Sequence, residues 1–388
     1  MISSVVPGRI DASRRSVAAL FVVNAMVFAS VVTRFAEVKQ EFGLGELSFG
    51  VMVACGPVGS VLGSVVAGRL VAGVGAVRVA AFSSVILGVL LTLVGIAGSA
   101  PVLGAILFAV GVADATADVA NNTHGLEIER RLGRSIINGL HGAWSAGAIA
   151  GGLLGLAALQ LQVPREAHFL LLGLAIVAVS LVSLPRLPLP PSAPGPEVQA
   201  PHARRSVSCL LLVACALAVV GAFLEDLGST WGGIYLREEN AAPLADTGFA
   251  FVAMMGAVTI GRFVSDRLVD RIGASATAQI GSALSLAGLL LVVVAPVAWV
   301  TIIGFGLLGL GIAPLIPLAM GAADRAPGLA VGTGVAVAAT VMRLGFLASP
   351  LLVGAVAEAS GLRTALAICL LVPVSGIVLA QRLRSAAP

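Results

Sequence analysis

Residues 261–273 read GRFVSDRLVDRIG, a short charged stretch between two long apolar segments. A related stretch, GSVVAGRLVAGVGA, occupies residues 63–76 and aligns without gaps to residues 261–274, at an offset of 198. Seven of the fourteen aligned positions are identical, among them Arg69 with Arg267 and Gly75 with Gly273. Internal similarity at about half the chain length indicates a duplicated architecture.

The composition predicts a protein that lies in lipid. Hydrophobic residues make up 58% of the chain and charged residues only 11%, whereas soluble domains are about 25% charged. The net charge of +4 comes almost wholly from arginine, and we expect it to set membrane orientation, with no nucleic-acid partner. The four cysteines lack metal-ligand spacing, so no metal or other cofactor is expected.

Twelve apolar stretches of about 19 to 26 residues are each long enough to cross a ~30 Å hydrocarbon core as a helix. The sequence therefore predicts an all-α integral membrane protein with twelve transmembrane helices in two six-helix pseudo-repeats. The predicted spans are 16–37, 47–70, 76–97, 101–123, 136–160, 166–184, 207–228, 246–268, 274–297, 299–322, 329–354 and 362–381. A proline-rich linker, 185–206, separates the halves 1–184 and 207–388.

The basic residues support this topology. Seventeen of the 23 fall in segments on the side of the N-terminus, four fall in the opposite segments, and Arg34 and Arg343 lie within spans. Such an excess marks the cytoplasmic side of a membrane protein. Both termini are therefore predicted to be cytoplasmic.

Twelve spans in two related halves, a central linker and a charged loop motif resemble the major facilitator superfamily of secondary transporters. Its loop signature, roughly G-x-x-x-D-R-x-G-R, is split here. Residues 266–273 keep Asp-Arg and the glycine but begin with Asp266, and residues 68–75 keep both glycines but have Ala-Gly in place of Asp-Arg. The stretches TRFAEVKQEFGL, DVANNTHGLEIERRLGRS and EDLGSTWGGIYLRE look like a bacterial branch near the fucose-permease-like transporters, many of unknown substrate. The resemblance implies a monomer in the bacterial cytoplasmic membrane, transporting by alternating access.

The fourth span carries an acidic stripe. Asp114, Asp118 and Asn121 recur at i, i+4 and i+7 on one helix face, and Asn122 widens that stripe. Ionisable groups in lipid mark pathways for ions or substrates. We expect the two carboxylates to carry protons and the asparagines to line the substrate cavity; the alternative is that these groups only hydrogen-bond neighbouring helices.

His141 in the fifth span falls at a similar depth to Asp118, which predicts a contact between the two side chains. That contact is either a structural pair closing the cytoplasmic side or a proton relay, because histidine titrates near neutral pH. Trp144, one turn later, either stacks on a ligand or fills a helix seam.

The second half lacks the acidic stripe, since the offset places Ile312 and Ile316 opposite Asp114 and Asp118. Proton coupling is therefore expected in the first half. Arg343, near the middle of the eleventh span, is expected in the substrate cavity together with Asn24, unless it is held in a structural pair.

Two further groups of charged residues are candidates for conformational roles. One ends the first and seventh spans, and is read as an outer gate or as ordinary interfacial anchoring: Arg34, Glu37, Glu225, Asp226 and Trp231. The other lies in the repeated loops, and is read as a conformational latch: Asp266, Arg267, Asp270, Arg271 and Arg69.

The predicted function is proton-coupled transport of a small polar organic solute, sugar-like or carboxylated. An exporter of small amphipathic compounds is the alternative, and a receptor or channel is a minor one. No nucleotide-binding loop and no nucleophile or metalloprotease motif is present, so no enzymatic activity is expected. The expected partners are the solute, protons and the lipid bilayer.

Overall fold

The structure of the chain is a computed structural model that describes residues 7–187, 208–329 and 332–385. Within these residues all regular structure is helical, and no strand occurs. Most of the predicted linker 185–206 falls outside the described residues, so its role as a linker stays a prediction.

Eleven helical segments of the described residues are long and apolar enough to cross a membrane. The longest, Leu244–Val294, includes two of the twelve predicted spans, and Gly273 lies at their boundary. Gly273 has φ +83° and ψ 162°, a conformation that favours glycine and interrupts helix α9 (Gly248–Val294). The predicted all-α membrane architecture is therefore confirmed.

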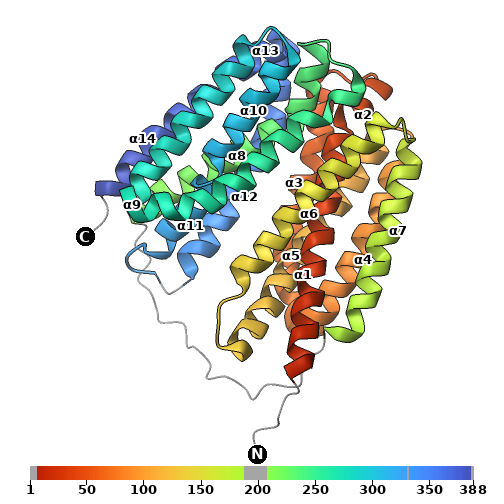
Figure 1. The fold of residues 1–388 in the computed structure, drawn as a ribbon, viewed down its shortest axis with the longest axis vertical. Coiled ribbons are helices and arrows are strands. Elements are labelled where there is room, and N and C mark those ends of the chain that lie inside the picture. Colours follow the sequence, from red (N-terminus) through yellow and green to blue (C-terminus); the bar gives the residue numbers. More distant parts are fainter. Residues whose placement is uncertain (1–6, 188–207, 330–331, 386–388) are drawn as a thin grey trace, which may run out of the picture. The chain divides into compact units, whose positions relative to one another are not determined.

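The helices form two compact units (Figure 1). The described residues of Met1–Arg34 and Cys55–Glu197 form the first unit, and those of Phe35–Ala54 and Val198–Pro388 form the second. The predicted division at the linker is based on the sequence repeat, whereas these two units are defined by which residues pack together. As a result, Phe35–Ala54 precedes the linker in sequence but packs with the second unit.

In the first unit, small residues let helix backbones approach one another. Its elements are α1 (Pro7–Thr33), α3 (Glu46–Val74) from Cys55 onward, α4 (Ala76–Gly95), α5 (Ala100–Leu132), α6 (Ile137–Gln160), α7 (Arg165–Ser183) and the 3-10 helix η1 (Leu184–Arg186). Helix α1 packs on α6, and α4 packs on α5 and α7. A Cβ at Gly147 of α6 would lie 2.2 Å from the Val22 carbonyl oxygen of α1, and one at Gly59 of α3 would lie 2.0 Å from that of Phe108. Glycine is thus required at both seams.

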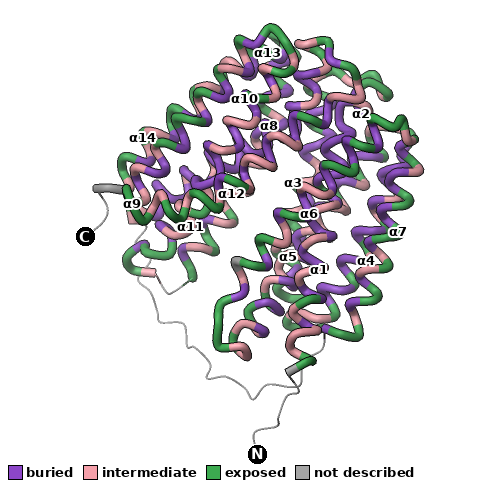
Figure 2. The backbone as a smooth tube through the Cα atoms, in the orientation of Figure 1, coloured by how far each residue is buried: buried purple, intermediate pink, exposed green. Residues whose placement is uncertain are grey.

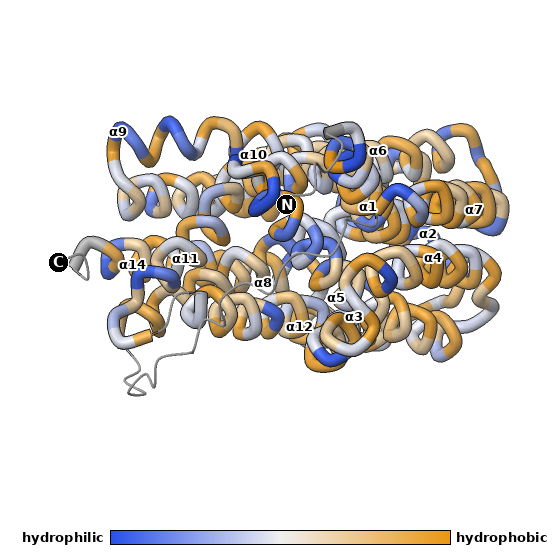
Figure 3. Tube along the Cα trace, turned by 90° about the horizontal axis from the view of Figure 1, so that it is seen from below, coloured by the Kyte–Doolittle hydropathy of each residue, from blue (hydrophilic) through white to orange (hydrophobic). Residues whose placement is uncertain are grey.

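In the second unit, α8 (Cys209–Glu238) is the central helix. The other elements are α2 (Phe35–Glu41), the start of α3, the 3-10 helix η2 (Leu244–Asp246), α9, α10 (Ala298–Ile312), α11 (Leu315–Asp324), α12 (Thr333–Ser360), α13 (Leu362–Ile368) and α14 (Leu371–Ser385). Helix α8 packs on α12, α11, α14, α9 and α10, and most of its residues are buried (Figure 2). Hydrophobic residues dominate along the helices of both units (Figure 3), as a lipid environment requires.

Three predicted spans are interrupted, among them the twelfth, 362–381, which is divided between α13 and α14. The first, 16–37, is broken at Arg34, whose backbone N–H bonds the carbonyl of Val31 in a tight turn before α2 begins. The tenth, 299–322, is broken between α10 and α11 at Pro314, which has no N–H to continue the helical ladder. Continuous apolar character reveals none of these breaks.

Candidate functional site

Three predicted site residues meet through Asn24 in the first unit. Asn24, buried on α1, donates from Nδ2 to Asp114 Oδ1 of α5 at 2.9 Å, and its Oδ1 accepts from Trp144 Nε1 of α6 at 3.3 Å. The indole N–H can only donate, so it must meet the amide oxygen, and the amide nitrogen is left for the carboxylate. One side chain therefore joins three helices and links a carboxylate to an indole.

The rest of the acidic stripe follows α5 toward its C-terminal end. Asn122 donates from Nδ2 to Oδ1 of Asp118 at 2.8 Å and to the backbone carbonyl of Asp118 at 2.9 Å. Asn121 is buried, and its Oδ1 has no hydrogen-bond partner among the described residues. The exposed ring of His141 packs edge-on against Phe21 of α1, with ring centroids 5.5 Å apart. A contact between Asp118 and His141 stays a prediction.

A second histidine, His124, was not singled out from the sequence. It is buried on α5, one turn beyond Ala120, and its Nε2 lies 3.0 Å from Ser13 Oγ. Ser13 in turn donates to the carbonyl of Leu187 at 2.9 Å. Since the serine proton is used there, Nε2 of His124 carries the proton that the serine accepts, which holds α1 and α5 together. A serine in the charged N-terminal region gave no sign of this bond.

The residues predicted for an outer gate lie in different surroundings. Arg34, in the first unit, is 2% exposed and donates from Nη2 to the carbonyl of Val163 at 2.8 Å. In the second unit, Glu37 lies in the first turn of α2, while Glu225 and Asp226 are buried within α8. Trp231 is fully buried, and its ring packs edge-on against Phe49 at a centroid distance of 5.4 Å.

Arg343 and the predicted latch belong to the second unit, apart from Arg69. Arg343 is half-buried on α12. Asp266, Arg267, Asp270 and Arg271 are exposed along α9 just before Gly273, and Arg69 is exposed on α3. Within the described parts of the chain these five latch residues form no ion pair, and Arg267 bonds only the Phe263 carbonyl of its own helix. Their action as a latch stays a prediction.

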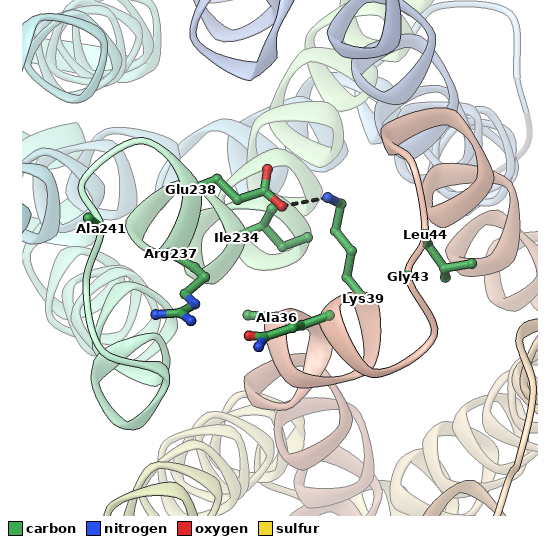
Figure 4. Close-up of a pocket in the computed structure, with 9 residues that line it drawn as sticks. Ala36, Lys39, Gly43, Leu44, Ile234, Arg237, Glu238 and Ala241 are labelled. Atoms are coloured by element: carbon green, nitrogen blue, oxygen red, sulfur yellow. Dashed lines mark hydrogen bonds and ion pairs between the residues drawn. The ribbon is translucent and has the colours of Figure 1, made fainter.

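A charged network of the second unit involves three residues that were not predicted. Lys39 of α2 bonds Glu46, at the start of α3, at 2.9 Å, and also bonds Glu238, at the end of α8. Figure 4 shows Lys39 reaching to Glu238 beside a cavity of about 480 Å³ that Arg237 also lines. Each of the three residues is a charged residue at or beyond the end of an apolar segment. That position was the only sign of the network in the sequence.

Apolar and backbone contacts extend this network. Phe49 packs on Phe35 as well as on Trp231. Glu358 of α12 accepts a hydrogen bond from the backbone N–H of Leu47 at 3.1 Å. A Cβ at Gly50 would lie 2.2 Å from the carbonyl oxygen of Pro350. The segment Phe35–Ala54, which we call the docked segment, is thus fastened to α8 and α12 by ionic, aromatic and close backbone contacts.

Comparison with known proteins agrees with the resemblance seen in the sequence. A profile of the Major Facilitator Superfamily matches residues 17–274, well over half of the chain. The chain belongs to this superfamily. It is a multi-pass membrane transporter by family and by its apolar helices.

Three relatives align along most of the chain. The uncharacterized transporter y4wD of Sinorhizobium fredii is 29% identical over 355 residues, covering 90% of this chain and 92% of that protein. An uncharacterized MFS-type transporter of Yersinia pestis is 27% identical over 331 residues, which is 84% of each chain. The membrane protein MosC of Rhizobium meliloti is 28% identical over 361 residues, with 90% and 85% covered.

Solved structures share the superfamily fold at low sequence identity. A bacterial homologue of the human lysosomal transporter Spinster aligns with a TM-score of 0.77 and 12% identity over 96% of both chains. The nucleoside transporter NupG aligns with a TM-score of 0.70 and 15% identity, covering 96% of this chain and 98% of that chain. At these identities the likeness concerns the fold alone.

Proposed function

We propose that the chain is a proton-coupled secondary active transporter of a small polar organic solute, working by alternating access in the bacterial cytoplasmic membrane. The observation that carries this proposal is the bond from Asn24 to Asp114. It gives a carboxylate inside a membrane span a hydrogen-bonded connection to two other helices. Carboxylates at such positions are typical of proton relays in transporters.

Asn24 connects proton binding at Asp114 to the proposed solute site. Its amide donates to Asp114 and accepts from Trp144, so a proton gained or lost at Asp114 changes the bond that also positions the Trp144 indole. Asp118, with Asn122 bonded to it one turn along α5, offers a second carboxylate to the same pathway. His141 extends that pathway if it reaches Asp118.

The substrate side of the proposal rests on the polar residues of both halves. Asn24, Asn121 and Asn122 supply hydrogen-bond donors and acceptors, and Trp144 supplies a flat apolar surface. Arg343 offers a positive charge for a carboxylate or for several hydroxyl groups. The solved structure of NupG is described as a nucleoside transporter, and a nucleoside is also a small polar solute.

The docked segment is proposed as the outer gate of the transport cycle. The predicted gate residues Trp231 and Glu37 belong to the same region as Lys39, which bonds Glu46 within the segment and Glu238 on α8. Opening toward the outside then requires the Lys39 bond to Glu238 to break while its bond to Glu46 persists.

Transport by purified protein in proteoliposomes tests the coupling. Solute uptake or efflux is measured for a panel of sugars, carboxylates and nucleosides, with and without a pH gradient. Asp114→Asn is expected to lower the gradient-driven rate at least about tenfold, since that residue can no longer release a proton. Asn24→Leu, which removes both hydrogen bonds at similar volume, is expected to do the same.

Thr123→Val is the matched control, because Thr123 lies exposed on α5 and bonds only a carbonyl of its own helix. Its rate is expected to equal that of the unmodified protein. Unchanged gradient-driven transport in both Asp114→Asn and Asp118→Asn would contradict proton coupling at this stripe.

A further inference from the structure

A cluster of buried oxygen-bearing side chains lies where α8 packs against α12, in the second unit. Asp226 of α8 is 7% exposed, and its Oδ1 accepts a hydrogen bond from Thr230 Oγ1 at 3.3 Å. Ser349 of α12 is fully buried beside the Asp226 carboxylate. Ser229, one turn after Asp226 on α8, is 3% exposed.

Three oxygen atoms of this cluster have unused bonding capacity. Asp226 Oδ2 and Ser229 Oγ are buried and have no hydrogen-bond partner among the described residues, and the Ser349 hydroxyl, although close to the Asp226 carboxylate, makes no well-aligned hydrogen bond there. Buried polar atoms are almost always satisfied, because an unsatisfied one costs roughly 1–3 kcal/mol. Incompletely bonded oxygens on this carboxylate and on two neighbouring serines indicate that something outside the chain completes the cluster.

The charges of the cluster do not balance. Glu225 and Asp226 are adjacent and both buried. The positive charge of Arg262 on α9 acts on Glu225, whereas the only charged group that acts on Asp226 within the described residues is Glu225 itself. With both carboxylates ionised, the three groups sum to one negative charge in a membrane span. A single positive charge would neutralise it.

Helix α12 has a backbone acceptor without a helical donor close to Ser349 in sequence. Pro350 follows Ser349 inside α12 and has no N–H, so it cannot donate to the carbonyl of Phe346 one turn earlier. Carbonyl groups released in this way inside membrane helices are typical ligands for bound cations. Gly345 keeps α12 close to α8, since a Cβ there would lie 2.5 Å from the carbonyl oxygen of Val219.

The duplication shows that this cluster belongs to the second half alone. Subtracting the offset of 198 from Asp226, Ser229 and Thr230 gives Phe28, Val31 and Val32, none of which offers a side-chain oxygen. The acidic stripe of α5 has the opposite distribution, with isoleucines in the second half. Each half therefore carries one set of acids within its apolar helices that the other half lacks.

We propose that Asp226, Ser229, Thr230 and Ser349 bind one monovalent metal cation, of the sodium type, at a site separate from the proposed proton site at Asp114. Hard cations take oxygen ligands, and a carboxylate with three hydroxyl groups supplies them. A proton on Asp226 would neutralise the charge and could be donated to Ser349, but it would leave the Ser229 hydroxyl without a partner. A divalent ion would leave an excess positive charge.

Thermal unfolding of the purified full-length protein tests this site. The protein is heated in about 100 mM sodium chloride and, in parallel, in equal concentrations of potassium and choline chloride. Sodium is expected to raise the unfolding temperature by about 2 °C or more over choline, because a ligand that binds only the folded state stabilises it. Equilibrium binding of radioactive sodium to the same protein should saturate at one ion per chain.

Asp226→Asn and Ser349→Ala are each expected to abolish the sodium-specific shift and to weaken sodium binding at least about tenfold. Ser285→Ala is the matched control, because Ser285 is a buried serine of the same unit whose hydroxyl already bonds the Gly281 carbonyl. It should keep the shift, and so should Asp114→Asn. Ser229→Ala gives a further reading if Asp226→Asn does not fold.

Three results would overturn the proposal. One is an unmodified protein that unfolds at the same temperature in sodium and choline. Another is a sodium shift that survives in both Asp226→Asn and Ser349→Ala. The third is stabilisation by acidic pH alone, without any effect of sodium, which would mean that Asp226 is simply protonated. None of these results bears on proton coupling at Asp114.

Discussion

At the scale of single residues, Lys39 shows how a buried charge is kept ionised. Burial alone would lower the pKa of Lys39, but its bonds to the carboxylates of Glu238 and Glu46 outweigh burial and raise that pKa above the usual 10.5. A raised pKa means that the folded protein holds the proton more tightly than the unfolded chain. The stabilisation is therefore fully present below pH 10.5 and is lost as pH rises through the raised value.

Because the pKa of Lys39 is raised, we expect the docked segment to be insensitive to mildly alkaline pH. A spin label on Gln40→Cys, with the four native cysteines replaced by alanine, should report equal mobility at about pH 8.5 and about pH 9.5. Lys39→Met, which keeps the length of the side chain but not its charge, should be more mobile at both values. A label that loosens between these two pH values in the presence of Lys39 would show that the lysine loses its proton early.

Asn24 shows what single residues in the sequence can and cannot reveal. An asparagine and an aspartate within apolar spans are conspicuous, so Asn24, Asp114 and Trp144 were all predicted as site residues. That one amide joins the other two depends on the rotation of three helices about their axes, which the positions of apolar residues do not determine. Asp226 was likewise noted as charged, but its neighbour Ser349 comes from another helix and gave no signal.

At the scale of elements, the docked segment is held by a lysine with two acidic partners, and these partners should have opposite effects. Glu238→Gln removes the carboxylate on α8 and should favour release of the segment by about threefold to tenfold. Glu46→Gln removes the partner that Lys39 keeps after release, so release then leaves a charge unpaired. It should disfavour release by a similar factor. Spin-label distances between Gln40→Cys and a second label on α8 would measure both populations.

Equal shifts in the same direction for the two variants would show that Lys39 is only a general anchor and does not exchange partners. Lys39→Met in the same assay gives the reference for a segment without the charge. Because Gln preserves the size of Glu, a change in packing alone cannot explain an opposite pair of results.

Close backbone contact is the other means by which the segment is held, and Gly50 tests it. Gly50→Ala places a Cβ 2.2 Å from the Pro350 carbonyl oxygen, so the start of α3 must move away from α12. We expect a loss of about 1–3 kcal/mol in the free energy of unfolding. Gly68→Ala in the same helix has open space around its Cβ and should be neutral or stabilising by up to about 1 kcal/mol. Equal unfolding temperatures for the two variants would contradict the contact.

Helix breaks were the least predictable elements. In the first and tenth spans, apolar residues continue on both sides of Arg34 and Pro314. Hydropathy alone therefore predicts one continuous helix where the backbone forms two. A proline gives a warning of such a break, whereas Arg34 gives none, because its turn depends on one backbone bond to Val31. At Gly273 the repeat in sequence did mark the boundary, since glycine recurs there at Gly75, where φ is also positive.

At the scale of the whole molecule, the charged stretch before Gly273 is expected to act in the conformational cycle and not in binding. Asp270→Ala should lower the transport rate several-fold without changing solute affinity, because Asp270 is exposed on α9 and distant in sequence from the proposed site. Ala72→Asp, which restores the acid to the first copy of the repeat, should not compensate. Transport rate and half-saturating concentration in proteoliposomes separate the two effects. An unchanged rate in Asp270→Ala would make the stretch a relic of duplication.

The docked segment also limits how this chain can be divided. A cut in the linker 185–206 gives a C-terminal fragment without Phe35–Ala54, although the fully buried Trp231 packs against Phe49 of this segment. Such a fragment would expose an aromatic surface that the N-terminal fragment must cover by association. Association of separately expressed halves would then depend on a segment that the N-terminal fragment supplies to the C-terminal one. A C-terminal fragment that begins with a fused copy of Phe35–Ala54 should be more soluble in detergent than one without it.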